Sequence, residues 1–237
     1  MVPQGFKRKQ RMRVLAFAGT ILFLFAYTIP GAAAEKSAPP APLILFGAQS
    51  TNVYPLDRVK SKGMIEYWRT VLHKHGENNA FASGNSSMSQ PVRKQWEALT
   101  AKFPKLSQTQ QLQTISAFIN QLPGESDHIG YGEEYWAYPA EFLSRYRGDC
   151  KAYAAAKYLA LRHLGWPEDA LWLVLVFHLS HNEGHAVVAA QKDGQIFILD
   201  NLSRPKDLIM PHEKQASIYR PVLAFNETTV WVFPGTQ

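Results

Sequence analysis

Three residues that can act together in acyl-group chemistry occur along the chain in the order Cys150, His185 and Asp200. A thiol attacks an acyl carbon as the thiolate, so it needs a base, and a histidine can serve as that base. A carboxylate on the other ring nitrogen fixes the histidine tautomer and stabilises the imidazolium. Cys150 is the only cysteine in 237 residues. We therefore take these residues as candidate nucleophile, base and orienting carboxylate, with the Cys150 backbone N–H as a candidate oxyanion donor.

The sequence around Cys150 predicts a helix that begins at the thiol. Residues 150–164 are rich in Ala, Leu, Lys and Tyr and contain no Gly or Pro. Gly148 and Asp149 precede them as a turn residue and a helix N-cap. The first turn of a helix favours an anion, which predicts a lowered thiol pKa. The alternative is that Cys150 is a small buried hydrophobic residue.

A predicted hairpin brings the other two residues together. Asp193-Gly194 is a strong tight-turn signal between two predicted strands, residues 185–190 and 195–200. A two-residue turn in this register places His185 and Asp200 on one face as diagonal neighbours, with Cβ atoms roughly 7–8 Å apart or less. A register shift of one residue would place them on opposite faces.

The remaining pattern predicts an α+β fold, because helices come first and an antiparallel sheet comes last. The aromatic-rich loop at 125–138 either lines a cleft or packs over the central helix. The other predicted elements are helices at 61–75, from Ser89 onward, 107–122 and 139–146, and strands at 171–177, 218–225 and 229–233.

The N-terminus has the layout of a secretory signal. Five basic residues lie within positions 7–13, an apolar run follows from Val14 to Ile29, and small residues lead to a predicted cleavage after Ala34. The alternative is an uncleaved anchor, although the apolar run is short for a full span. We divide the chain into a signal peptide at 1–34, an N-terminal tether at 35–60 and one domain at 61–237.

Removal of the predicted signal peptide lowers the net charge of the chain. The chain has 25 Lys+Arg and 19 Asp+Glu. The signal carries five of the bases and no acid, so the exported chain is nearly neutral. The basic balance is then no argument for nucleic-acid binding. An unpaired cysteine is unusual in an oxidising, exported compartment, which favours a chemical role for Cys150.

Around these residues the chain resembles the bacterial transglutaminase-like cysteine proteinases, which include the periplasmic LapG-type proteases. The resemblance covers roughly residues 60–235. It rests on Gly148-Asp149-Cys150, Tyr153-Ala154, Ala156-Lys157-Tyr158, Leu161-Arg162, Gly165, Gly184-His185-Ala186-Val187 and Leu199-Asp200-Asn201-Leu202, with further similarity at 135–143 and 220–226.

The resemblance implies a papain-like, transglutaminase-type core in which Cys150 is the nucleophile, His185 the base and Asp200 the orienting residue. It also implies a large surface adhesin as substrate, clipped near its N-terminus at a paired-alanine site so that biofilm cells are released. The implied regulator is an inner-membrane receptor that senses cyclic di-GMP.

Calcium is a further implication of the resemblance, because LapG-type members bind it through acidic residues at and just after the cysteine motif. Here Asp149 is acidic, but Lys151 and Ala152 stand where an acidic pair is typical. Calcium needs several oxygen ligands, and an ammonium group opposes it. Asp149 is thus the only retained acidic candidate, and we expect no cofactor to be required.

Other functions compete with this interpretation. His178, His181, Glu183 and His185 could bind zinc, although their spacing is not that of a metalloprotease helix. The same triad could transfer the acyl group to an amine, as in a transglutaminase or an amidase. A non-catalytic binding domain could keep the scaffold, but all three triad members are present. We predict a periplasmic cysteine endopeptidase that acts on a protein, binds no nucleic acid and meets the membrane only through its signal segment.

Overall fold

The computed structural model describes residues 40–60, 63–123, 135–146 and 148–235. The predicted signal peptide at 1–34 and the first residues of the predicted tether lie outside the described residues. Within the described ranges, no helix is long and apolar enough to cross a membrane.

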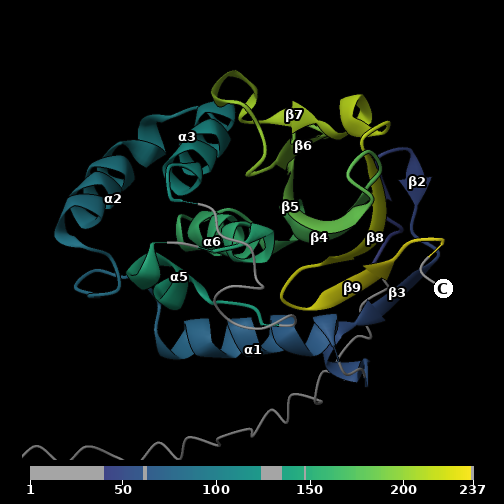
Figure 1. Cartoon of the computed structure of the whole chain (residues 1–237), viewed down its shortest axis with the longest axis horizontal. Coiled ribbons are helices and arrows are strands. Elements are labelled where there is room, and N and C mark those ends of the chain that lie inside the picture. The colour runs from purple at the N-terminus through teal and green to yellow at the C-terminus, as the bar shows by residue number, and fades with distance from the viewer. Residues whose placement is uncertain (1–39, 61–62, 124–134, 147, 236–237) are drawn as a thin grey trace, which may run out of the picture. The chain divides into compact units, whose positions relative to one another are not determined.

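The helices match the sequence prediction and lie mostly on one side of the sheet (Figure 1). Their ends follow local rules. Ser107 and Gln110 form a capping box at the start of α3, and a proline stands in the first turn of α2. The helices are α1 (Met64–Glu77), α2 (Gln90–Lys102), α3 (Gln108–Asn120), α5 (Pro139–Arg145) and α6 (Cys150–His163).

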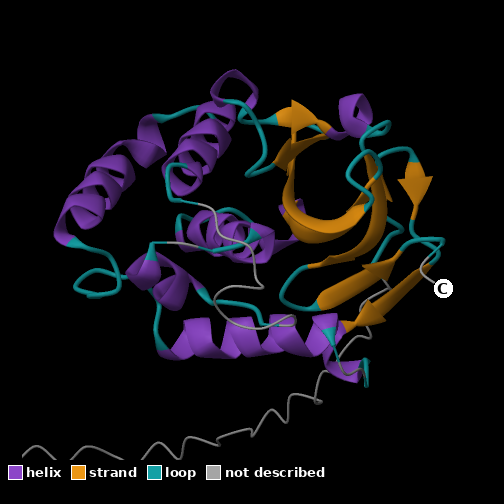
Figure 2. Ribbon diagram, in the orientation of Figure 1, coloured by secondary structure: helices purple, strands orange, loops and turns teal. Residues whose placement is uncertain are grey.

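Six strands after the helices and one strand before them, residues 52–55, form a seven-stranded antiparallel sheet that curls strongly (Figure 2), so the predicted α+β class is confirmed. Its strand order is β3-β9-β8-β4-β5-β6-β7. A two-stranded pair, β1 (Ile44–Leu45) with β2 (Ala48–Gln49), stands apart from it. The strands of the main sheet are β3 (Asn52–Pro55), β4 (Leu171–His178), β5 (Glu183–Lys192), β6 (Gln195–Leu199), β7 (Met210–Pro211), β8 (Tyr219–Phe225) and β9 (Thr229–Val232).

The hairpin register predicted from the sequence is confirmed. Lys192 pairs with Gln195 across the turn, and both turn residues have positive φ, 50° at Asp193 and 76° at Gly194. Such a turn matches the twist of the flanking strands, so it fixes which side chains share a face.

Part of the segment predicted as a tether, 35–60, belongs to the main sheet. Residues 52–55 form β3, which pairs with β9 at one edge of the main sheet. Leu45 and Phe46 are buried against the face of the sheet that α6 does not cover. The prolines at 39–42 suggested an extended linker. The apolar residues that follow them, Leu43, Leu45 and Phe46, instead pack on the sheet.

Helix α6 packs closely on the sheet because both surfaces are built from small residues. All positions from Ala152 to Leu161 are buried, and Ala186, Val188 and Ala190 of β5 belong to the same core. Small side chains let a helix approach a strand closely. The start of α6 is therefore held against the first residues of β5.

The aromatic loop before the cysteine lies mostly outside the described residues, but its last part is described. Trp136 is buried and packs between Tyr67 and Phe225, with ring centroids 6.5 and 6.1 Å away. For this residue, packing in the core is the correct interpretation and lining a cleft is not.

Candidate active site

Helix α6 presents the thiol at its N-terminal end. Asp149 Oδ1 accepts the Ala152 N–H at 3.0 Å, so Asp149 is the N-cap expected from the sequence. Cys150 is the first residue of the helix, and its thiol is free and partly buried. The first backbone N–H groups of a helix have no acceptor within the helix. The Cys150 N–H can therefore donate a hydrogen bond to the carbonyl oxygen of a substrate.

The predicted lowering of the thiol pKa is wrong. Burial raises the pKa of Cys150 to about 12, and the neighbouring Asp149 carboxylate adds to the effect. A hydrogen bond from the Ala186 backbone N–H acts in the opposite direction but is outweighed. The N-terminus of α6 favours the thiolate, but packing against β5 removes water from the sulfur, and this second effect is the larger one. This thiol therefore keeps its proton unless a base takes it.

His185 and Asp200 form a hydrogen-bonded pair in which His185 is the candidate base. His185 Nε2 lies 2.9 Å from Asp200 Oδ1, and both side chains are buried. The remaining ring nitrogen, Nδ1, is then the one that can take a proton from the thiol. The carboxylate fixes the tautomer in which Nε2 carries the hydrogen.

Asp200 is held by more groups than the sequence suggested. The Tyr219 hydroxyl donates to Oδ2, the Leu202 N–H donates to Oδ1 at 2.9 Å, and Asn120 Nδ2 donates to the Asp200 backbone carbonyl at 2.9 Å. Burial on its own would raise the pKa of Asp200. The hydrogen bond and charge of His185, followed by Tyr219 and the Leu202 N–H, outweigh it and hold that pKa below its ordinary value. Asp200 is thus anionic at neutral pH.

Cys150 and His185 face one cavity of about 300 Å³. Lys151, which follows Cys150 in the chain, also lines this cavity. The other lining residues come mainly from β4, β5 and β8. The three residues singled out from the sequence therefore meet at the junction between α6 and the curled sheet. A peptide bond placed in this cavity would have a thiol, a base and a free helix N–H around it.

Comparison with known proteins identifies the family of the chain. The family description "bacterial transglutaminase-like cysteine proteinase BTLCP" matches residues 78–233. The chain belongs to the bacterial transglutaminase-like cysteine proteinases. It is accordingly a cysteine peptidase of the transglutaminase-like class.

Solved structures of Legionella pneumophila LapG are similar to this proteinase. The calcium-bound form has 26% identity and a TM-score of 0.53, and the match covers 72% of this chain and 88% of that one. The EGTA-treated form has 25% identity and the same TM-score, with 81% and 87% covered. No curated protein gave a significant match.

The calcium-bound LapG structure raises the question of whether this proteinase could hold the same ion. Asp149 is the acidic candidate, but both of its oxygens are engaged. Oδ1 accepts the Ala152 N–H and Oδ2 accepts the Lys151 ammonium. The two side chains are 10% and 14% exposed, so a cation already covers the carboxylate. These residues do not fit calcium, which needs at least six oxygen ligands in most protein sites.

The histidines before His185 do not form the zinc site considered from the sequence. The His178 and His181 rings stack at 3.8 Å, and His178 Nδ1 accepts the His181 N–H at 3.4 Å. His185 is committed to Asp200. In the part of the chain that the structure describes, no group of three or more His, Cys, Asp or Glu residues is arranged to hold a metal.

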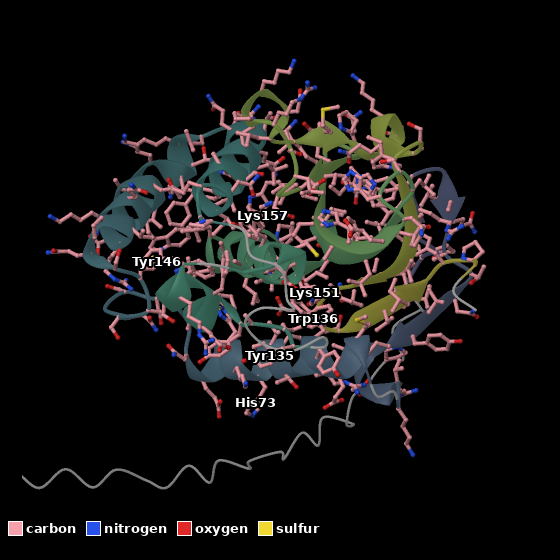
Figure 3. All side chains as sticks on the ribbon, viewed as in Figure 1. His73, Tyr135, Trp136, Tyr146, Lys151 and Lys157 are labelled. Atoms are coloured by element: carbon pink, nitrogen blue, oxygen red, sulfur yellow. The ribbon has the colours of Figure 1, made fainter. Side chains whose placement is uncertain are left out.

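One buried cation was not singled out as a site residue. Lys157 lies on α6 two turns after Cys150 and is 1% exposed (Figure 3). Burial lowers its pKa to about 7, while the Asp200 carboxylate acts to raise it. The sequence did contain a signal for its burial, because residues seven apart share one face of a helix.

Proposed function

We propose that this proteinase is a periplasmic endopeptidase in which Cys150, His185 and Asp200 form the catalytic triad. The observation that carries the proposal is the buried 2.9 Å contact between His185 and Asp200 beside a cavity that also contains Cys150. A carboxylate-held imidazole near a thiol is the arrangement that nucleophilic acyl chemistry requires.

The raised thiol pKa decides how the first step runs. Cys150 rests as a neutral thiol, and its proton moves to His185 Nδ1 as the sulfur bonds to the acyl carbon. The carbonyl oxygen becomes an oxyanion, to which the Cys150 N–H donates. His185 then gives the proton to the leaving amine, and the carbon–nitrogen bond breaks to leave a thioester.

The second half of the reaction restores the enzyme. His185 takes a proton from water, the hydroxide oxygen attacks the thioester carbon, and the carbon–sulfur bond breaks. The proton returns to the sulfur and a carboxylic acid leaves. Asp200 stays ionised and stabilises the imidazolium in both halves.

The substrate we propose is a large surface adhesin, and the compartment is the periplasm. The support is the sequence resemblance to LapG-type proteases, the signal-like residues 1–34 and the presence of a single cysteine in the chain. Cell fractionation tests the compartment, and N-terminal sequencing of the mature protein tests cleavage after Ala34. A mature chain that begins at Met1 and stays in the cytoplasm would contradict both.

We also propose that activity needs no added calcium, because the Lys151 ammonium neutralises Asp149 from within the chain. The site has a cation of its own where a metal would otherwise be needed to offset the carboxylate next to the thiol. EGTA should therefore leave the rate of cleavage unchanged. A loss of activity in EGTA that calcium restores would show this reasoning to be wrong.

The decisive experiment compares wild type with Cys150→Ala and Cys150→Ser on cells or membranes that carry candidate adhesins, with and without EGTA. Wild type should release a truncated surface protein, and neither variant should. Circular dichroism checks that the variants fold. Equal release by wild type and folded Cys150→Ala would refute the catalytic assignment.

A further inference from the structure

The turn between β1 and β2 departs from the usual rule for its sequence. Phe46 and Gly47 lie between the paired residues Leu45 and Ala48, and their φ values are 52° and 80°. A two-residue hairpin turn with positive φ at both positions prefers Asn-Gly or Asp-Gly. The turn between β5 and β6 follows this preference. A bulky side chain on a residue with positive φ is an outlier, so contacts with other parts of the protein must hold Phe46 in this conformation.

A buried histidine holds the backbone of this turn. His212 Nδ1 accepts the Phe46 N–H at 2.9 Å, and the two rings meet at 80° with centroids 6.2 Å apart. His212 Nε2 lies 3.1 Å from Glu213 Oε1. The carboxylate favours the tautomer in which Nε2 carries the hydrogen, which leaves Nδ1 as the acceptor. Phe46 and His212 are both buried, so this hydrogen bond is shielded from water.

The ring of Phe46 packs against Tyr219, the first residue of β8. The two rings meet at 66°, with centroids 5.6 Å apart. The Tyr219 hydroxyl donates to Asp200 Oδ2, and the Tyr219 ring lies nearly parallel to that of His185, with centroids 5.9 Å apart. Tyr219 therefore contacts both the proposed base and the carboxylate that orients it.

The Tyr219 ring is confined from a second element as well. His178, the last residue of β4, meets it at 88° with centroids 5.0 Å apart. Edge-on contacts between aromatic rings are directional, because the positive edge of one ring faces the negative face of the other. Tyr219 is also buried, so its ring has no solvent-filled space in which to turn. The contacts from Phe46 and His178 thus direct the hydroxyl at Asp200.

We propose that Phe46 is a positioning residue for the active site: its ring holds Tyr219, which in turn orients the Asp200 carboxylate toward His185. The inference rests on the proposed catalytic triad. Backbone outliers concentrate at functional sites, and here the outlier places a ring in a turn where asparagine would fit better. A displaced Tyr219 hydroxyl would remove a donor from Asp200 and make the carboxylate a stronger proton acceptor. The acid limb of the reaction at Cys150 should then move to higher pH.

The test measures the rate at which iodoacetamide alkylates Cys150 as a function of pH. Cys150 is the only cysteine in the chain, so the mass increase reports on this residue without requiring peptide hydrolysis. Phe46→Leu removes the ring and keeps an apolar side chain, whereas Phe46→Asn gives the turn its preferred sequence. In both variants the acid limb should move up by about 0.5–1 pH unit, which lowers the rate on that limb about 3- to 10-fold.

Leu43→Ala is the matched control. Leu43 is buried in the same apolar cluster as Phe46, but it lines a cavity whose walls include Trp172 and Trp231 and not Tyr219. This variant should keep the wild-type limb. Circular dichroism checks that each variant folds.

A double variant tests whether Phe46 acts through the tyrosine hydroxyl. Phe46→Leu combined with Tyr219→Phe should show the limb of Tyr219→Phe alone, because the donor that Phe46 positions is already absent. A wild-type limb in folded Phe46→Leu would overturn the proposal, and so would an equal shift in Leu43→Ala. Shifts that add in the double variant would overturn it as well. If Phe46→Leu does not fold, the limb of Phe46→Asn decides in the same way.

His185→Ala separates this inference from the triad on which it rests. Without the base, the alkylation rate should follow the unassisted thiol of Cys150, whose pKa burial raises to about 12. If His185→Ala reacts like wild type, the proposed triad fails. If His185→Ala loses the acid limb while folded Phe46→Leu keeps that of wild type, the triad stands and the role of Phe46 is refuted.

Discussion

Gly148 offers a sharp test of how Cys150, the proposed nucleophile, is positioned. It lies two residues before Cys150, and a Cβ added there would lie 2.5 Å from Cδ2 of Phe142 and 2.8 Å from Cβ of Ala152. Carbon atoms in contact prefer about 3.5–4.0 Å, so the overlap is roughly 1 Å. Its φ is not in the left-handed range. The requirement for glycine at this position is therefore one of space.

The magnitude of the Gly148→Ala effect follows from what must move. Phe142 is fully buried and packs edge-on against Tyr153, with ring centroids 5.0 Å apart. Overpacking of this kind costs about 1–3 kcal/mol. If the backbone retreats instead, the start of α6 moves by roughly 1 Å, a displacement that can reduce a catalytic rate about 100-fold.

Chemical denaturation and peptidase kinetics measure the two effects, and Gly76→Ala is the control. Gly76 is exposed in α1 and an added Cβ meets nothing within 4 Å, so its replacement should stabilise the protein by at most about 1 kcal/mol. Adding Phe142→Leu to Gly148→Ala should recover part of the loss, as a positive interaction in a double-mutant cycle. If Gly148→Ala were as stable and as active as Gly76→Ala, the packing argument would be refuted.

Three further predictions concern the charges of the site. Tyr219→Phe removes a donor from buried Asp200, which should cost about 1–3 kcal/mol and raise the pKa of Asp200. The acid limb of the pH–rate profile should therefore move to higher pH, and a limb that stays in place would contradict the assigned role of Tyr219. Lys157 has a pKa of about 7 in the folded protein against 10.5 for the free group. The unfolded chain then binds more protons between these values, so wild-type stability should rise with pH there, and this rise should be absent in Lys157→Met. Lys151→Glu exchanges the ammonium beside Asp149 for a second carboxylate, and its activity should become sensitive to EGTA and recover with calcium; insensitivity would count against the role given to the ammonium.

The parts of the site that follow short-range rules were predictable from the sequence. Asp193-Gly194 allows only a tight turn, and that turn fixes the register that puts His185 and Asp200 on one face. Asp149 is the N-cap because its carboxylate can reach an N–H three residues on. Each of these inferences depends on a few neighbouring residues, so no knowledge of the tertiary structure is needed.

The properties that were missed depend on contacts between distant segments. The pKa of Cys150 is set by burial against β5, which the composition of a helix cannot reveal. Tyr219 reaches Asp200 from a strand that follows a long irregular connection. β3 pairs with β9 across almost the whole length of the described chain. No pattern within any one of these segments encodes its partner.

The burial of Lys157 was predictable from its spacing to Cys150. A lysine in an alanine-rich helix is normally placed on the solvent face, and this one is not. Once Cys150 is assigned to a catalytic junction, the residue seven positions later must lie on the same face of the helix. A helix whose nucleophile faces a sheet therefore buries Lys157, and a buried ammonium requires an anion close by. The Asp200 carboxylate favours the ammonium form, but burial outweighs it and lowers the pKa of Lys157 to about 7. The same face of α6 thus carries the proposed nucleophile, Cys150, and a buried lysine whose charged form the Asp200 carboxylate favours.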